Sequence, residues 1–353
     1  MKFNNTVLKQ MLIPLVLAFV VSCEDYKYED LGEGMFAEFY TNKGLIVTKL
    51  YFEDKPLTVS NFVSLAEGNN PLVTDSLKGI PFYDNTLFHA VVPDFIIQGG
   101  DRTATGLGHP GYKFADEFVK FKSGKVKYKH GTKGVLSMAN SGVNSNGAQF
   151  FFTQKETPWL DGKHSVFGFA QKGRAVLDNI QAKDSLYTVK IIRQGKQAQE
   201  FNAPKIFVNR LAYLDSLEVV KEKEYVLKKE AFLEQMNYPE AELSPKGIRI
   251  FTKVVGNGPR AQSNQLLQVH YVGYLEDGTI FDSSYKRNKP LTFRLDVDQL
   301  ISGWTEGIRG LREGSEVTLF IPYYLAYGEE GRLPLIPEKA DLIFDMKLVK
   351  VGK

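Results

Sequence analysis

Residues 87–101 read LFHAVVPDFIIQGGD, and this stretch decides how the first half of the chain folds. It joins β-branched and aromatic residues to a Pro-Asp pair and ends on Gly-Gly-Asp, a pattern typical of strands and turns. Comparable segments recur between residues 34 and 197, and helical patterns interrupt them near residues 58–67 and 175–181. Many strands with two helices predict a closed β-barrel plugged by helices. The strand-like segments are MFAEFYT, GLIVTKLYF, DFIIQGG, GVLSMAN, AQFFFTQ, VFGFAQ and YTVKIIRQ.

The composition indicates a globular protein of about two domains. The 353 residues are 43% hydrophobic and 24% charged, and 44 basic against 41 acidic residues give a net charge of +3. This balance predicts no nucleic-acid partner. Four of the five histidines are scattered without metal-ligand spacing, so we expect no metal and no cofactor. They are His89, His109, His130 and His270.

The amino terminus has the pattern of an export signal. Lys2 and Lys9 precede an apolar run over residues 11–21 that is too short to span a bilayer, and the only cysteine, Cys23, follows it. The sequence VVSC at 20–23 resembles a bacterial lipobox, which implies lipidation at Cys23 and anchoring to a membrane of the cell envelope. The alternative is an ordinary signal peptide with an incidental cysteine. Residues 24–33 are acidic and polar and predict a flexible tether.

The rest of the chain divides into a linker and a second domain. Residues 198–243 are rich in Lys, Glu, Leu and Val, which predicts a linker of one or two helices. Residues 244–353 return to strand-like segments, with a hairpin signal at 276–278 and a short helix over 300–307 that points Trp304 inward. This pattern predicts a half-open antiparallel sheet wrapped on one helix.

The first domain, residues 34–197, carries several ordered motifs. FHAVVPDFIIQGGD (88–101), GHPGYKFADE (108–117), VLSMANSGVNSNGAQFFFT (135–153) and WLDGKHSVFG (159–168) follow one another along the chain. Together they resemble the cyclophilins, a family of peptidyl-prolyl isomerases, which implies an eight-stranded barrel with a substrate groove on its outer face. By this resemblance the groove residues are Phe95, Ile96, Gln98, Ala139, Asn140, Gln149, Phe151, Trp159, Leu160 and His164.

Ala90 departs from the cyclophilin pattern, because the family has its catalytic arginine at this position. Rotation about a prolyl bond meets a barrier of about 18–20 kcal/mol from amide resonance. A guanidinium is always charged and can donate a hydrogen bond that lowers this barrier, whereas alanine has no donor. We therefore expect the first domain to bind proline-containing segments and to catalyse poorly.

The second domain resembles the FKBP family of prolyl isomerases. The motifs are VHYVGYLEDGTIFDSSYKRNKPLTFRL (269–295), LISGWTEGIRGL (300–311), IPYYLAYGEEG (321–331) and LIFDMKLVKV (342–351). An apolar pocket disfavours the planar amide more than the twisted one, so this chemistry needs no acid, base or nucleophile. By resemblance, the catalytic residues are Tyr271, Asp282, Ile301, Trp304 and Tyr327, and the substrate-binding residues are Phe281, Arg287, Phe293, Leu300, Ile336 and Phe344.

Together these resemblances imply a mainly β protein with helices: a cyclophilin-like barrel, a helical linker and an FKBP-like half-barrel. The expected function is prolyl isomerisation that assists the folding of envelope proteins, because the uncatalysed reaction takes tens to hundreds of seconds. Expected ligands are unfolded or proline-containing polypeptides and macrocycles of the cyclosporin and tacrolimus types. The alternative is a non-enzymatic scaffold that grips proline motifs of one envelope partner.

Overall fold

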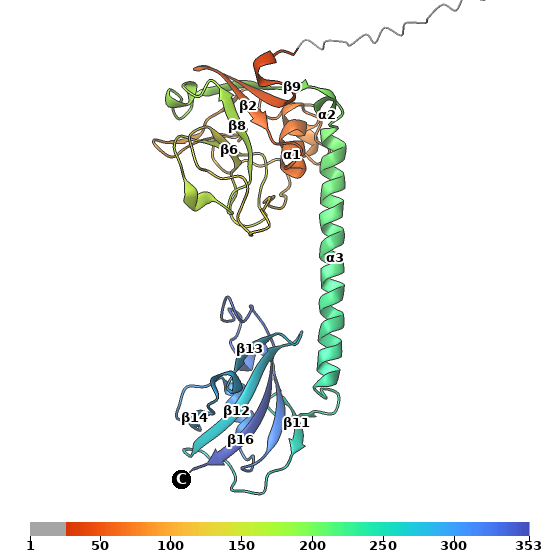
Figure 1. Cartoon of the computed structure of the whole chain (residues 1–353), viewed down its shortest axis with the longest axis vertical. Helices are drawn as coiled ribbons and strands as arrows, with labels where there is room; N and C mark the ends of the chain where they lie inside the picture. The colour runs from red at the N-terminus through yellow and green to blue at the C-terminus, as the bar shows by residue number, and fades with distance from the viewer. Residues whose placement is uncertain (1–25, 353) are drawn as a thin grey trace, which may run out of the picture. The chain divides into compact units, whose positions relative to one another are not determined.

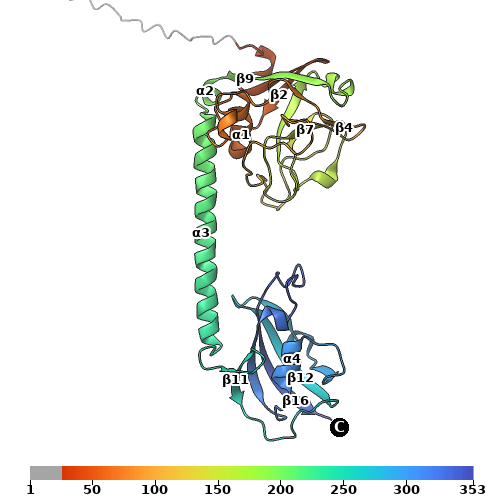
Figure 2. The ribbon, with the colours of Figure 1, turned by 180° about the vertical axis from the view of Figure 1, so that it is seen from behind.

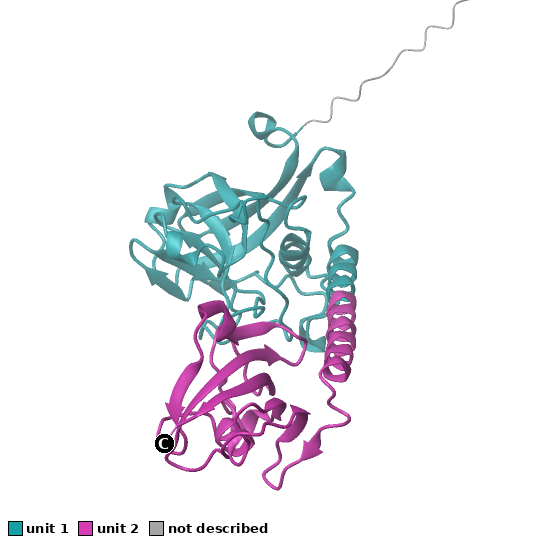
Figure 3. Cartoon of the chain, turned by 60° about the horizontal axis from the view of Figure 1, so that its bottom comes forward, with its two compact units in different colours: residues 1–214 teal, residues 215–353 magenta. Residues whose placement is uncertain are grey.

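The computed structural model describes residues 26–352. The chain separates into two compact units, residues 1–214 and 215–353 (Figure 3). Each unit has an apolar core of its own, so each is described by itself. No helix within residues 26–352 is both long enough and apolar enough to cross a bilayer. The predicted signal peptide and Cys23 lie outside the described residues.

The first unit is built on a curled antiparallel sheet of nine strands (Figures 1 and 2). Its order is β3-β9-β1-β2-β8-β6-β7-β5-β4, and a bridge from Leu87 to Asp101 joins β3 to the chain just beyond β5. The short β3 and β4 are separated only by Phe88 and His89, so counting them as one interrupted strand gives the expected eight-stranded barrel. The strands are β1 (Gly34–Thr41), β2 (Gly44–Leu50), β3 (Thr86–Leu87), β4 (Ala90–Val92), β5 (Ile96–Gly99), β6 (Val135–Met138), β7 (Phe150–Thr153), β8 (Val166–Lys172) and β9 (Ser185–Gln194).

Helix α1 (Pro56–Ala66) fills the barrel core, as predicted for residues 58–67. Proline at its first turn is pre-shaped for a helix start, and the whole helix from Leu57 onward is buried. Phe62 stacks on Tyr83 with 5.0 Å between ring centroids and meets Phe150 edge to face. The second predicted helix, near 175–181, is only a 3₁₀ turn, Val176–Asp178.

The segment predicted as a tether is different in the structure. Residues 26–33 include a short 3₁₀ helix, Glu29–Leu31, and pack against the barrel. Tyr28 contacts Phe36 and donates its hydroxyl hydrogen to the buried carboxylate of Glu38, which also pairs with Lys27. The reason is that a buried carboxylate needs partners. The tether interpretation therefore does not describe residues 26–33.

One helix, α3 (Ala203–Gln235), makes up most of the predicted linker and follows the short α2 (Lys196–Gln199). Its first turns belong to the first unit, where Phe207 is buried against Tyr112 and Phe114. Its last turns belong to the second unit, where Phe232 packs on Tyr274 and Lys229 pairs with Glu276 at 2.7 Å. The helix ends are thus parts of the two cores.

The second unit is a seven-stranded antiparallel sheet around a short helix, α4 (Ser302–Ile308). Its order is β10-β11-β15-β16-β12-β13, and β14 also pairs with β12. Two glycines on one side of α4 let the helix approach β15 closely: a β-carbon at Gly303 would lie 2.3 Å from Ile321, and one at Gly307 would lie 2.4 Å from Leu319. The strands are β10 (Glu242–Leu243), β11 (Arg249–Val254), β12 (Leu266–Leu275), β13 (Ile280–Ser283), β14 (Leu291–Arg294), β15 (Glu316–Ile321) and β16 (Leu342–Val351).

We predict that Gly307→Ala destabilises the second unit by about 1–3 kcal/mol, because the added methyl group overpacks α4 against β15. Urea unfolding of the Trp159→Phe chain measures this, since Trp304 is then the only tryptophan. Gly131→Ala is the control, because nothing lies within 4 Å of a β-carbon there. Equal unfolding midpoints for Gly307→Ala and its parent would contradict the close approach.

Candidate active sites

One row of side chains crosses the outer face of the barrel. Ala90 on β4 is the register partner of Gln98 on β5, Gln98 is the partner of Phe151 on β7, and Phe151 is the partner of Ser137 on β6. Register partners point to the same face of a sheet. Ile97, one residue from Gln98, is buried in the core. The row therefore faces away from the core.

Aromatic rings frame this row. Phe95 stacks on Trp159 with 5.9 Å between ring centroids, and Phe151 meets His164 edge to face at 5.5 Å. Trp159 remains 54% exposed, whereas Phe151 and Leu160 are buried. The arrangement gives an apolar floor with an exposed aromatic rim, which suits a proline ring.

Polar groups around the floor are partly free. The side-chain amide of Gln98 donates to Gln149 at 2.8 Å, and Gln149 donates to the carbonyl of Gly108 at 2.8 Å. His164 Nδ1 lies 3.0 Å from the carbonyl oxygen of Met138. Within the described part of the chain, neither the backbone N–H nor the carbonyl of Asn140 has a hydrogen-bond partner. An extended peptide can pair with both of these groups.

Arg102 does not take the place that Ala90 leaves open. Arg102, the nearest arginine in the sequence, donates to the carbonyls of Pro81 and Phe82 and lies over the Phe82 ring. Its guanidinium is therefore held away from the row. The two neighbouring amides, Gln98 and Gln149, are neutral and bonded to each other.

His130 supports the floor from behind. Its ring is fully buried, stacks on Phe151 at 5.8 Å, and has Asp161 Oδ1 and Ser137 Oγ each 3.0 Å from a ring nitrogen. Burial lowers the pKa of His130, although its hydrogen bond with Asp161 opposes the change. The neutral imidazole is therefore the native form, with Nδ1 donating to Asp161 and Nε2 accepting from Ser137.

The second unit holds an open cavity with an aromatic base. A cavity of about 550 Å³ lies between β12, β13, β16, the amino end of α4 and the loop after β15. Trp304 is buried at its base, with Tyr271 at 4.8 Å and Phe344 at 5.2 Å in edge-to-face contact. The cavity is lined by Tyr271, Phe281, Asp282, Leu291, Gln299, Leu300, Ile301, Ser302, Trp304, Ala326, Tyr327, Arg332 and Phe344.

A polar group of three side chains closes one edge of this cavity. Tyr271 and Arg287 both donate to the carboxylate of Asp282, and Arg287 also donates to the Tyr271 hydroxyl at 2.8 Å. Burial and the hydrogen bond to Asp282 raise the pKa of Tyr271 to about 12. Burial alone would raise the pKa of Asp282, but the hydrogen bonds from Arg287 and Tyr271 lower it instead. The three groups hold the Tyr271 ring in place as a wall.

Two donors at the cavity are available to a ligand. Within the described part of the chain, the Ile301 backbone N–H and the Tyr327 hydroxyl have no hydrogen-bond partner. The buried Trp304 Nε1 also has none. The Trp304 ring makes edge-to-face contacts with the rings of Tyr271 and Phe344. A peptide that crosses the cavity can place carbonyl oxygens against Ile301 and Tyr327.

The structure brings most of the predicted pocket residues together. Eight of the predicted residues line the cavity, whereas Arg287, Phe293 and Ile336 do not. Arg287 acts on Asp282 and Tyr271 as described, Phe293 lies 6.1 Å from Trp304, and Ile336 is buried in the same core. Sequence analysis missed Leu291, Gln299, Ser302, Ala326 and Arg332.

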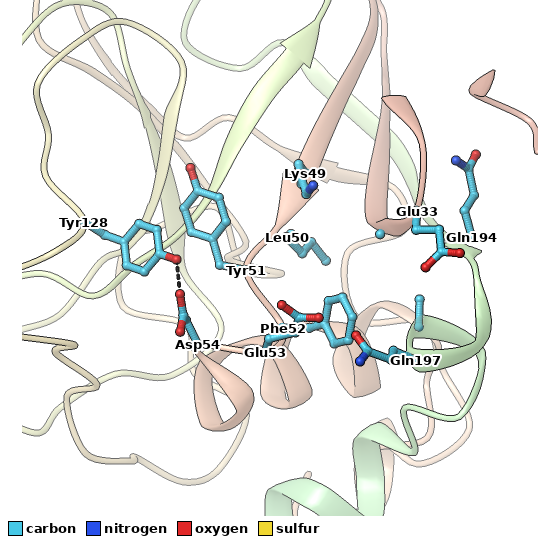
Figure 4. Close-up of a pocket in the computed structure, with 12 residues that line it drawn as sticks. Glu33, Lys49, Leu50, Tyr51, Phe52, Glu53, Asp54, Tyr128, Gln194 and Gln197 are labelled. Atoms are coloured by element: carbon cyan, nitrogen blue, oxygen red, sulfur yellow. Dashed lines mark hydrogen bonds between the residues drawn. The ribbon is translucent and has the colours of Figure 1, made fainter. Parts of the chain in front are cut away.

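A further cavity of about 440 Å³ in the first unit, between Lys49, Tyr51, Phe52, Tyr128 and Gln197, was not predicted and contains none of the groove residues (Figure 4).

Comparisons with known proteins find two isomerase families in this chain. The model of the cyclophilin type peptidyl-prolyl cis-trans isomerases matches residues 36–197, and that of the FKBP-type peptidyl-prolyl cis-trans isomerases matches residues 258–349. The chain is 44% identical to the probable peptidyl-prolyl cis-trans isomerase A of Mycobacterium leprae, over 41% of this chain and 78% of that protein. It is 43% identical to peptidyl-prolyl cis-trans isomerase B of Streptomyces anulatus, over 43% of this chain and 86% of that protein. A crystal structure of AtFKBP13 is 43% identical, with a TM-score of 0.31, over 32% of this chain and 98% of that one.

The chain therefore belongs to the cyclophilin-type peptidyl-prolyl cis-trans isomerases and carries a second isomerase domain, of FKBP type. The predicted order of the two domains is confirmed. The enzyme class is the predicted one, because both matched families are prolyl isomerases.

We predict that acid destabilises the first unit through His130. The unfolded chain protonates this histidine near its ordinary pKa of about 6.5. The native state, in which the pKa is lowered, resists protonation. The unfolded state then binds more protons, so the free energy of unfolding falls as pH drops from about 7 to about 5. In the Trp304→Phe chain, Trp159 fluorescence reports this unit, and His130→Gln should flatten the pH dependence. Equal slopes with and without His130 would contradict the prediction.

Proposed function

We propose that the two isomerase domains divide the work. The FKBP-type cavity is the main catalyst, and the cyclophilin-type groove binds proline-containing segments with weakened turnover. The observation that carries this proposal is Ala90, whose side chain has no donor, in a groove from which Arg102 is held away by the carbonyls of Pro81 and Phe82. The cavity of the second unit, in contrast, keeps its aromatic base, its wall and two free donors.

The physics of the groove supports binding more than catalysis. Its aromatic floor can hold a proline ring, and the Asn140 backbone can pair with the flanking peptide. Both interactions are made equally well with planar and twisted prolyl bonds, so they bind without lowering the barrier. Loss of one well-placed donor to the transition state typically costs about 10²–10³ in rate.

The cavity of the second unit acts on the amide through its surroundings. A twisted prolyl amide is less polar than a planar one, so it is the form that the apolar surface of Trp304, Phe281 and Phe344 favours. The Ile301 N–H and the Tyr327 hydroxyl would hold carbonyls on the two sides of the ring. Because the Tyr271 ring is fixed by Asp282 and Arg287, the cavity is preorganised for this state.

We propose a location and a kind of client from the residue pattern at positions 1–23. Lipidation at Cys23 would hold the protein on a bacterial membrane, where newly exported chains arrive unfolded. Folding chains with several prolines would meet a binding groove and a catalytic cavity on one molecule. Tacrolimus-type macrocycles would occupy the cavity, and cyclosporin-type macrocycles the groove.

We predict that Trp304→Leu in the full chain lowers isomerase activity at least about tenfold, because the base of the cavity is lost. Exchange between cis and trans forms of a Leu-Pro peptide, measured by NMR, is the readout. The matched variant is Trp159→Leu, which removes the other tryptophan, at the groove rim, and should lower total turnover far less. A larger loss for Trp159→Leu would reverse the proposed division of work.

We also predict that Ala90→Arg restores catalysis to the groove. In the Trp304→Leu chain the remaining activity should rise by at least about tenfold, since a guanidinium would return beside Gln98. Ala90→Gln is the control, because it adds bulk and a neutral amide at the same position. If both variants leave the activity unchanged, the weak turnover of the groove has a cause other than Ala90.

A further inference from the structure

The rim of the second-unit cavity has an unbalanced positive charge. Asp282 and Arg287 form an ion pair, so their charges offset one another. Arg332 also lines the cavity, and its guanidinium lies 5.9 Å from the centre of the Tyr327 ring. Within residues 26–352, no carboxylate forms an ion pair with Arg332. Its charge is therefore available to a ligand.

The backbone keeps Arg332 at this rim. Its N–H donates to the Ile336 carbonyl at 2.8 Å, and the Ile336 N–H donates back to the Arg332 carbonyl at 3.0 Å. Ile336 is buried in the core of the unit, so it anchors the turn. The guanidinium also lies over the Tyr327 ring, and arginine interacts favourably with the face of an aromatic ring.

The acidic residues of the same loop do not neutralise this charge. Glu329 pairs with Lys339 at 2.7 Å. Glu329, Glu330 and Glu338 line a separate hollow that includes neither Arg332 nor Tyr327. The loop thus presents its carboxylates to one hollow and its arginine to the cavity.

We propose that Arg332 is a specificity-determining residue that favours substrates with Asp or Glu directly beside the proline. The proposal rests on the proposed catalytic role of this cavity. Because the guanidinium lies 5.9 Å from the centre of the Tyr327 ring, a substrate residue whose carbonyl met the Tyr327 hydroxyl would lie near it. A carboxylate there gains a charge partner, an amide gains less, and an ammonium is repelled.

The test compares peptides that differ only beside the proline. Two series are needed, Ala-Xaa-Pro-Phe and Ala-Ala-Pro-Xaa, with Glu, Gln or Lys as Xaa, and kcat/KM is measured by NMR exchange. In one of the two series we expect kcat/KM to be about two- to fivefold higher for the Glu peptide than for the Gln peptide at low salt, and lower for the Lys peptide than for the Gln peptide. The ratio should approach one at about 0.5 M salt, because the pair is exposed to solvent.

Three variants test whether Arg332 causes this preference. Arg332→Gln should abolish the Glu-to-Gln ratio, and Arg332→Lys should retain part of it. Arg260→Gln is the matched control, because it removes the same charge from outside the cavity lining and should keep the ratio. A ratio of one in both series for the unaltered chain, or an undiminished ratio in Arg332→Gln, would overturn the proposal.

A binding measurement separates this proposal from the proposed function. In the Trp159→Phe chain, Trp304 is the only tryptophan, so its fluorescence reports peptide in the cavity whether or not the cavity is the main catalyst. Tighter binding of the Glu peptide than of the Gln peptide, lost in Arg332→Gln, supports the role of Arg332 even if Trp304→Leu keeps full turnover. Equal binding of the two peptides contradicts it even if Trp304→Leu is inactive.

Discussion

The alternation of side chains along paired strands is the constraint on which both sites depend. In the barrel, Gln98 and Phe151 face outward because Ile97 and Phe152, one position along, fill the core. In the second sheet, Phe344 faces α4 while Ile343 packs with Phe320 in the cluster beside the end of α3. A slip of one residue in either register would turn the site residues to the wrong face of the sheet.

The two sites differ in which of their polar groups are already bonded. In the groove, the Gln149 amide accepts from Gln98 and donates to the carbonyls of Gly106 and Gly108, so a substrate that uses this amide must compete with existing hydrogen bonds, whereas the Asn140 backbone groups are free within the described part of the chain. In the cavity, the polar groups of the wall bond among themselves, but the Ile301 N–H and the Tyr327 hydroxyl do not. Preorganised free donors act on the substrate without first breaking a bond, which is the condition for strong stabilisation of a transition state.

The features that were predictable from the sequence are those encoded in short continuous segments. The order of the domains, the helix near residues 58–67 and the grouping of Tyr271, Trp304 and Phe344 follow from such segments, whose internal spacing fixes which residues share a face. The packing of residues 26–33 was not predictable in this way, because Tyr28 bonds to Gln194, which is 166 residues away. The position of Arg332 at the cavity was not predictable for a related reason. Its place at the cavity depends on the buried anchor Ile336 and on the ring of Tyr327, not on the motif that ends at residue 331.

Weak binding in the groove would suit a protein that also has a catalytic cavity. Two sites on one chain make the second encounter with a client intramolecular, which raises its effective concentration without any new contact. The higher effective concentration is useful only if the groove releases the segment before folding proceeds. A groove that binds tightly would retain the client and slow its folding. If the groove binds the proline ring mainly through its aromatic floor, as we propose, its retention of the client would be short. On the proposed division of work, Ala90 would lower turnover in the groove while leaving its aromatic floor in place.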